Sequence, residues 1–222
     1  FPVFLSAHIL RLSKVRDWIP ASVRCLGCAG LETGLLTAAH NGKGDDSCRR
    51  DACDSNQDNL KGSGLSLLRP GLPHLLGEIK KLGFQIKVDT NGTHPERLRR
   101  LVEEGLADYV AMDVKNSPRR YGETVGVPDF DLAPVEESVR LLQRSAVDHE
   151  FRTTLVRELH SEADLDAIAA WLEGAPKYFL QNFVDSGNLI GQGYHGFSLE
   201  ELRAFAERMR PHFGAVELRG VE

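Results

Sequence analysis

Strand-like and helix-like segments alternate from Pro70 to the end of the chain, and this alternation constrains the fold more than any other feature. Period-2 or short apolar runs predict strands at residues 84–89, 108–114, 149–156, 177–183 and 215–219. Between them, helical spacing predicts helices at residues 73–82, 93–105, 133–145 and 161–173, and from Ser198 onward. Thr93 is expected to open its helix with a capping box and an early proline, and Ser198 to cap the last helix. Strands joined by helices favour parallel pairing with right-handed crossovers. The sequence therefore predicts an α/β fold, as a partial or full βα barrel or a doubly wound sheet.

Composition narrows the class of protein. The chain has 222 residues, 41% hydrophobic and 27% charged, with a formal net charge of -5. A single globular core is expected from this length and balance. The chain is not strongly basic, so nucleic acid is not the favoured partner. No apolar run is long enough to cross a bilayer, so we expect no membrane partner and a cytoplasmic location.

Residues 1–68 differ from the rest of the chain. The stretch 41–64 is rich in Gly, Asp and Asn and poor in apolar side chains, so it cannot offset the entropy lost on ordering. We expect loop or disorder there. The predicted division of the chain is an atypical segment at 1–68, followed by the regular α/β unit at 69–222.

All four cysteines fall in the atypical segment. They are Cys25, Cys28, Cys48 and Cys53. Such clustering in a cytosolic chain points to metal or redox chemistry more than to disulfides. The spacing approximates a zinc ribbon, but the second pair is more widely set than the usual metal-binding turn. A zinc-stapled α/β protein and free thiols both remain open.

Polar side chains end three successive predicted strands. The first ends in Asp89, Thr90 and Asn91, the second in Asp113 and Lys115, and the third carries Arg152. Because the carboxyl ends of parallel strands meet at one edge, we expect these groups around one pocket. Gln181 and Asn182 on the next strand add amide groups to the same edge of the sheet. The alternatives are an Asn-Gly turn with a helix start for the first group and a solvated ion pair for the second.

The mixture of acids, bases and amides suits a zwitterionic small molecule better than a metal ion alone. Two histidines outside this group, His160 and His195, are expected to be surface or loop residues rather than acid-base catalysts.

Several blocks between Gly71 and Phe183 carry a family resemblance. They are Leu82 to Phe84, Lys87 to Gly92, Glu104 to Lys115, Glu150 to Val156, and Leu180 with Gln181, together with Tyr121. These blocks, which cover about half of the chain, resemble the radical S-adenosylmethionine activating enzymes of glycyl-radical systems. The resemblance is greatest to the anaerobic ribonucleoside-triphosphate reductase activating proteins.

The resemblance implies a fold, a reaction and partners. The fold would be a partial βα (TIM-like) barrel. The reaction would be reductive cleavage of S-adenosylmethionine at a [4Fe-4S] cluster, giving a 5'-deoxyadenosyl radical that abstracts a glycine hydrogen from a partner enzyme. The implied partners are a glycyl radical enzyme, here anaerobic ribonucleoside-triphosphate reductase, and a flavodoxin or ferredoxin-type electron donor.

The resemblance also implies roles for the strand-end residues. Asp89, Asn91, Asp113 and Lys115 would lie about the methionyl and ribose parts of S-adenosylmethionine. The two acids, with Thr90, would help hold a monovalent cation beside the cofactor carboxylate. We add Arg152 to this cofactor-binding set, because an arginine in a buried strand needs an acidic partner or an anionic ligand.

Two family motifs are absent from this chain. There is no C-x3-C-x2-C motif to hold the cluster, and the four cysteines do not match its spacing. Residues 64–68 stand where the family has Gly-Gly-Glu-Pro. We therefore expect this chain not to cleave S-adenosylmethionine. A non-catalytic barrel remnant that binds S-adenosylmethionine or a partner is the alternative function.

We predict that residues 1–68 are, in whole or part, an out-of-frame translation without a packed core. Leu65 to Leu68 can be encoded TTG AGC CTA CTN, and the same bases read from the third position give GAG CCT ACT, which is Glu-Pro-Thr. The missing motif thus fits another reading frame. Resequencing the encoding DNA tests the prediction, and an uninterrupted frame with peptides found by mass spectrometry across residues 20–60 would remove it.

Overall fold

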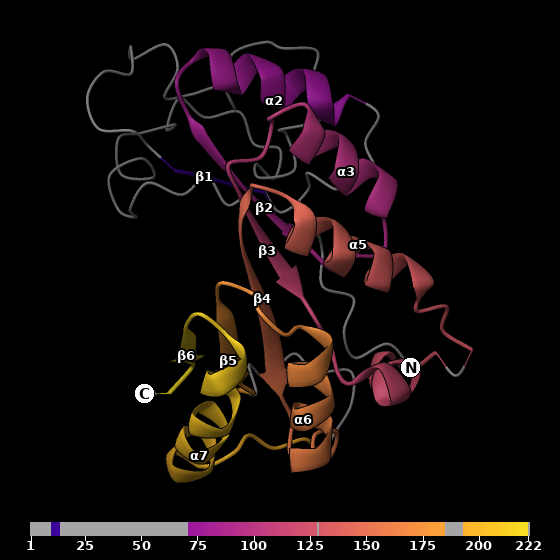
Figure 1. The fold of residues 1–222 in the computed structure, drawn as a ribbon, viewed down its shortest axis with the longest axis vertical. Coiled ribbons are helices and arrows are strands. Elements are labelled where there is room, and N and C mark those ends of the chain that lie inside the picture. Colours follow the sequence, from indigo (N-terminus) through magenta and orange to yellow (C-terminus); the bar gives the residue numbers. More distant parts are fainter. Residues whose placement is uncertain (1–9, 14–70, 128, 185–192, 222) are drawn as a thin grey trace, which may run out of the picture.

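The computed structural model describes residues 10–13, 71–127, 129–184 and 193–221. Its strands form one six-stranded sheet (Figure 1). The strands are β1 (Leu10–Ser13), β2 (Gln85–Thr90), β3 (Tyr109–Asp113), β4 (Asp148–Leu155), β5 (Tyr178–Asn182) and β6 (Val216–Arg219). The helices are α2 (Leu72–Lys81), α3 (Pro95–Glu103), α4 (Tyr121–Val125), α5 (Ala133–Arg144), α6 (Glu162–Trp171) and α7 (Leu199–Met209), with short 3-10 turns η2 (Pro118–Arg120) and η3 (Arg210–His212).

The strand order decides between the predicted architectures. Strands β2 to β6 are parallel and lie side by side in chain order. A doubly wound sheet would reverse its order at a switch point, and no reversal occurs among these strands. Crossovers of one hand that always advance in one direction put their helices on one face. The fold is therefore an α/β sheet of the partial-barrel kind, as predicted.

The two faces of the sheet differ in polarity because side chains alternate along each strand. On one face, Val88, Val110, Phe151 and Leu180 are at most 1% exposed and belong to the core that the helices cover. Helix α3 packs beside α5, and α6 beside α7, along this face (Figure 1). The other face carries mostly polar residues, at positions 87, 89, 109, 113, 150, 152, 181, 217 and 219. This second face is referred to below as the open face.

Local signals set most of the helix ends. The predicted cap at Ser198 is confirmed, since its side chain accepts from the Glu201 N–H in a capping box, and Ser161 caps α6 in the same way. The capping box predicted at Thr93 is wrong. Helix α3 begins after His94 without a side-chain cap, because the Thr93 amide and hydroxyl both donate to Asn91 instead.

The amino-terminal predictions lie mostly outside the described residues. Strand β1 is described, and it pairs antiparallel with β2 at the edge of the sheet, which the sequence did not indicate. The predicted disorder, the predicted frame change and all four cysteines fall in residues that the structure does not describe. Among the helices that it does describe, none has the length and apolar character needed to cross a bilayer.

Candidate functional site

Four charged side chains meet on the open face at the carboxyl ends of β2, β3 and β4. Arg152 on β4 donates from Nη1 to Asp89 Oδ1 on β2 at 2.6 Å, and from Nε to Asp113 on β3. The ammonium of Lys115, two residues past Asp113, lies 3.2 Å from Asp113 Oδ2. The predicted convergence of these four side chains is confirmed. They are referred to below as the strand-tip cluster.

Arg152 reaches Asp89 across an intervening strand. Neighbouring strands lie about 4.8 Å apart, and β3 separates β2 from β4. Ala111 is the β3 residue beside Asp89 in the register, and its small side chain leaves room for the guanidinium to extend over β3. One arginine thus ties three parallel strands together.

Burial and charge determine the ionisation of the strand-tip cluster. Asp89 is 4% exposed, and the side chains of Arg152 and Asp113 are 17% and 14% exposed. Burial alone would raise the pKa of Asp113, but Lys115 and Arg152 outweigh it and hold that pKa below its usual value. Burial likewise disfavours the Arg152 cation, but Asp113 and Asp89 outweigh it and raise the Arg152 pKa. Counted by their formal charges at neutral pH, the two acids and two bases of the cluster carry no net charge.

Thr90 and Asn91 are the other two residues predicted for this site. The Thr90 hydroxyl accepts from the Gly92 N–H at 3.1 Å, and Asn91 Oδ1 accepts from the Thr93 N–H at 3.1 Å. Both oxygens hold the turn that follows Asp89, as the turn alternative predicted. Gly92 is required there, because its φ is +77° and a Cβ would lie 2.2 Å from Met112 Cε. Cofactor binding by Thr90 and Asn91 stays a prediction.

The next strand contributes less to the site than its sequence indicated. Gln181 is exposed on the open face. Asn182 instead holds the backbone of Phe197, donating from Nδ2 to its carbonyl at 3.0 Å and accepting its N–H at 2.9 Å. The amide of Asn182 thus fixes the start of the segment that leads into α7.

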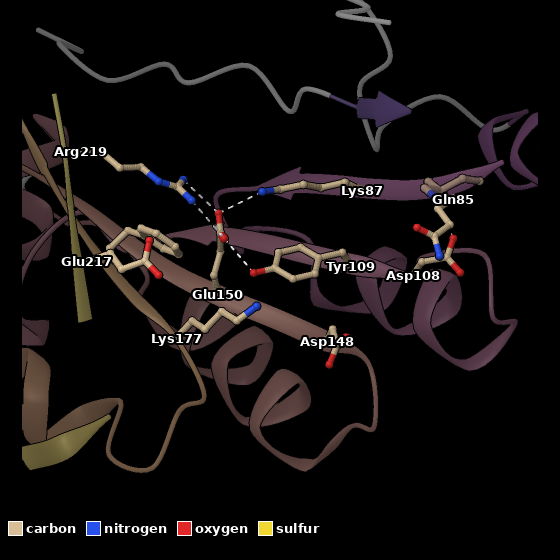
Figure 2. Close-up of a pocket in the computed structure, with 11 residues that line it drawn as sticks. Gln85, Lys87, Asp108, Tyr109, Asp148, Glu150, Lys177, Glu217 and Arg219 are labelled. Carbon is tan, nitrogen blue, oxygen red and sulfur yellow. Dashed lines mark hydrogen bonds and ion pairs between the residues drawn. The ribbon is translucent and has the colours of Figure 1, made fainter. Parts of the chain in front are cut away.

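The sequence also missed a second polar cluster on the open face, centred on Glu150 (Figure 2). Glu150 on β4 is 2% exposed and accepts from Lys87 Nζ at 3.0 Å, Tyr109 Oη at 2.8 Å and Arg219 at 3.3 Å. Burial would raise the Glu150 pKa, but the Tyr109 hydrogen bond and Lys87 outweigh it, so the pKa is lowered. Glu150 lines a pocket of about 440 Å³ and joins β2, β3, β4 and β6 there.

His160 is a further functional candidate that the sequence misjudged. It lies in the loop between β4 and α6, as the loop alternative predicted, but it is 6% exposed and is therefore not a surface histidine. Its Nε2 lies 2.9 Å from the carbonyl oxygen of Lys115, which connects it to the strand-tip cluster. His195 is exposed and pairs with Glu158, as expected of a surface histidine.

Metal ligands are not gathered in the described part of the chain. No group of three or more His, Cys, Asp or Glu side chains within it is arranged to hold a metal ion. The residues described here thus supply no ligand set for an iron-sulfur cluster. The strand-tip cluster does fit the polar end of an amino acid, since it offers acids to an ammonium and bases to a carboxylate.

Comparisons with known proteins found a sequence relative and a solved structure with a similar fold. No protein-family model matches the chain. A Methanocaldococcus jannaschii protein named "Putative glycyl-radical enzyme activating enzyme MJ1227" is 32% identical over 128 residues, which are 56% of this chain and 53% of that protein. The chain therefore spans about half the length of this curated relative.

A solved structure has the same fold. It is a domain of the pyruvate-formate lyase-activating enzyme from Bacteroides vulgatus, with a TM-score of 0.52, over 69% of this chain and 93% of that one. At 15% sequence identity, this likeness establishes the fold alone.

The strand-tip cluster predicts a specific pattern of stability. Arg152→Met leaves two buried acids without their shared cation, so it should lower the free energy of unfolding by about 3 kcal/mol at pH 7. Arg208→Met is the matched control, because Arg208 pairs with Asp166 at the exposed surface and its loss should cost less than about 1 kcal/mol. Denaturant unfolding measures both, and equal losses would contradict a buried anchoring role for Arg152.

The strand-tip cluster also determines how the free energy of unfolding changes at acid pH. The Asp113 pKa is lowered in the fold, so its stabilisation is complete above the unfolded value of about 3.9 and is lost as the pH falls through the folded value. Arg152→Met should therefore flatten the loss of stability below about pH 4, as measured by unfolding across pH 7 to 3. An unchanged acid limb would show that Arg152 does not hold the Asp113 charge.

Proposed function

We propose that this chain is the S-adenosylmethionine-binding part of a cytoplasmic radical S-adenosylmethionine enzyme that activates a glycyl radical enzyme. The observation that carries the proposal is the strand-tip cluster, which gathers two acids and two bases at the carboxyl ends of parallel strands. The similarity to an activating enzyme over 128 residues supports the reaction class. Anaerobic ribonucleoside-triphosphate reductase is the partner that we propose.

The charges of the cluster match those of the cofactor. S-adenosylmethionine carries an ammonium, a carboxylate, a sulfonium and ribose hydroxyls. Asp89 and Asp113 can accept hydrogen bonds from the ammonium or the hydroxyls, while Lys115 and Arg152 can donate to the carboxylate. The ammonium and carboxylate make the amino acid end of the cofactor a zwitterion, so a cluster without net charge can exchange its internal ion pairs for pairs with that end. The sulfonium lies outside this exchange.

Radical formation needs more than these residues. A [4Fe-4S] cluster would supply the electron for cleavage of the sulfonium, with a flavodoxin or ferredoxin-type protein as its donor. The family spacing of three cysteines is missing from the sequence. We propose that the chain binds and orients S-adenosylmethionine on its open face but does not cleave it.

Calorimetric titration of S-adenosylmethionine tests the proposal. The parent chain should bind, and Asp89→Ala and Lys115→Ala should each weaken binding at least tenfold, since each removes a group that would pair with the ligand. Lys81→Ala is the control, because Lys81 is exposed and pairs within its own helix. No binding by the parent, or equal binding by all four proteins, would refute the proposed site.

Anaerobic reconstitution tests the missing reaction. After incubation with iron and sulfide, we expect no stoichiometric cluster and no 5'-deoxyadenosine from S-adenosylmethionine. A full cluster with cofactor cleavage would contradict this part of the proposal. Zinc in aerobically purified protein would instead favour the zinc-stapled alternative.

A further inference from the structure

The segment that follows β3 forms hydrogen bonds, one residue after another, with β4 and with the loop that follows β4. The Val114 N–H donates to the Arg152 carbonyl at 2.9 Å, and the Val114 carbonyl accepts from Thr153 Oγ1 at 2.8 Å. The Lys115 carbonyl faces His160 Nε2 at 2.9 Å. Four consecutive residues, 114 to 117, make such contacts, so the backbone that carries Lys115 is aligned with the strand that carries Arg152.

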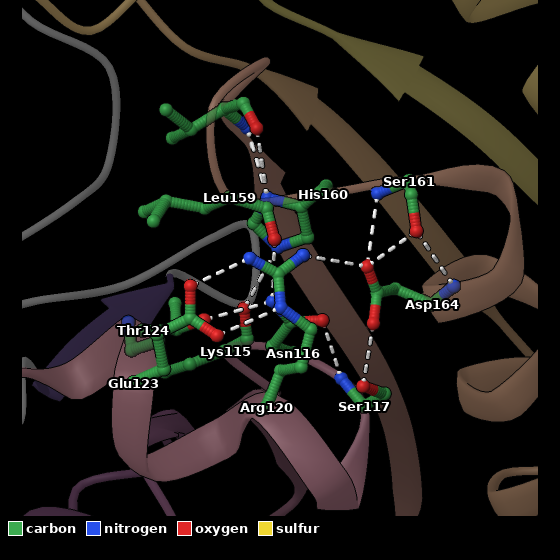
Figure 3. Close-up of polar contacts among 11 residues, drawn as sticks. Lys115, Asn116, Ser117, Arg120, Glu123, Thr124, Leu159, His160, Ser161 and Asp164 are labelled. Carbon is green, nitrogen blue, oxygen red and sulfur yellow. Dashed lines mark hydrogen bonds and ion pairs between the residues drawn. The ribbon is translucent and has the colours of Figure 1, made fainter. Parts of the chain in front are cut away.

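Asn116 and Ser117 continue this series of contacts (Figure 3). Asn116 is 0% exposed, and its Nδ2 donates to the Leu159 carbonyl and to Thr124 Oγ1, both at 2.8 Å. The Ser117 hydroxyl donates to Asp164 Oδ1 at 2.8 Å. Asp164 is also part of the capping box of α6, so the loop after β3 is fixed to the start of that helix.

Within this network, the side chain of His160 contacts the backbone of Lys115. Its Nδ1 lies 3.1 Å from the Val156 amide nitrogen. An amide N–H can only donate and a carbonyl can only accept. The Lys115 carbonyl therefore fixes a hydrogen on Nε2, which donates to it. Nδ1, which also lies 3.2 Å from the Val156 carbonyl oxygen, accepts from the Val156 N–H while the ring is neutral.

We propose that His160 is a positioning residue for the strand-tip cluster. By holding the Lys115 carbonyl, it sets the direction from which the Lys115 ammonium reaches Asp113. Arg152 reaches the same aspartate from β4. His160 lies in the loop after β4, so by holding Lys115 it fixes the two cations relative to the same strand. This inference rests on the proposed function only for the identity of the ligand, S-adenosylmethionine.

The surroundings of His160 favour its neutral form. Burial lowers its pKa, the carbonyls of Lys115 and Val156 oppose that effect, and the charges of Asp164 and Arg120 act in opposite directions. A proton added at Nδ1 would remove the acceptor of the Val156 N–H and would have the Val156 carbonyl, 3.2 Å away, as its own acceptor, so burial is the effect that favours the neutral ring. The neutral tautomer should therefore persist to a lower pH than in free histidine.

Two variants separate positioning from general packing. Asparagine places an oxygen near the position of Nδ1 and keeps the Val156 contact, whereas glutamine extends an amide toward the position of Nε2 and keeps the Lys115 contact. We expect His160→Asn to weaken S-adenosylmethionine binding about fivefold, the loss of one hydrogen bond of about 1 kcal/mol. His160→Gln should bind within about twofold of the parent. His212→Asn, which alters an exposed histidine paired with Glu173, should leave binding unchanged.

Nitrogen NMR without any ligand supplies an independent readout. The His160 signals of the parent should show the tautomer protonated on Nε2, and should stay neutral below the pH at which free histidine protonates. Titration like that of free histidine, or the opposite tautomer, would overturn the proposal even if the cofactor binds.

Equal losses of affinity and of melting temperature in both His160 variants would also overturn the proposal, since they would indicate a packing role only. If the parent binds no S-adenosylmethionine, the proposed function fails, and the NMR spectra still decide whether His160 holds Lys115.

Discussion

A guanidinium on a largely buried strand must be neutralised, and the position of Arg152 makes this requirement central to the molecule. Transfer of an isolated charge out of water is costly unless opposite charges and hydrogen bonds surround it. Asp89 and Asp113 provide both from the two preceding strands. The contact to Asp89 spans β3, so the ends of three strands have to stay together for the charge to be tolerated.

The polarity of the open face follows from the same constraint. Helices cover one side of the sheet with a continuous apolar core, while the other side holds two groups of charged residues. At the carboxyl ends the charges form the strand-tip cluster, where ligands bind in parallel α/β sheets. In the second group, Glu150 is already paired with Lys87, Tyr109 and Arg219. The first group has the position expected of a binding site, and the second serves to join strands.

Most elements could be predicted because their signals are local. Period-2 patterns, the early proline of α3 and the cap of Ser198 all act within a few residues. The rule that the ends of parallel strands converge was enough to predict that Asp89, Asp113, Lys115 and Arg152 lie close together. The cap at Thr93 failed because Asn91, only two residues away, competes for the same hydrogen bonds.

The remaining features depend on partners far along the chain. His160 meets Lys115 across 45 residues, and Glu150 meets Lys87 across 63. Neither contact has a local signature, so a histidine in a loop and a glutamate in a strand resemble surface residues in the sequence. Strand β1 is four residues long and pairs with a strand more than seventy positions later, which no pattern within it could indicate.

The central claim is that the strand-tip cluster binds S-adenosylmethionine, and the side-chain Nε–H signal of Arg152 tests it most directly. That proton points at Asp113 in the ligand-free protein. On titration with S-adenosylmethionine, we predict that the Arg152 signal shifts and saturates while the exposed Arg208 signal does not move. An Arg152 signal that stays fixed while the cofactor binds would place the site elsewhere and contradict the account.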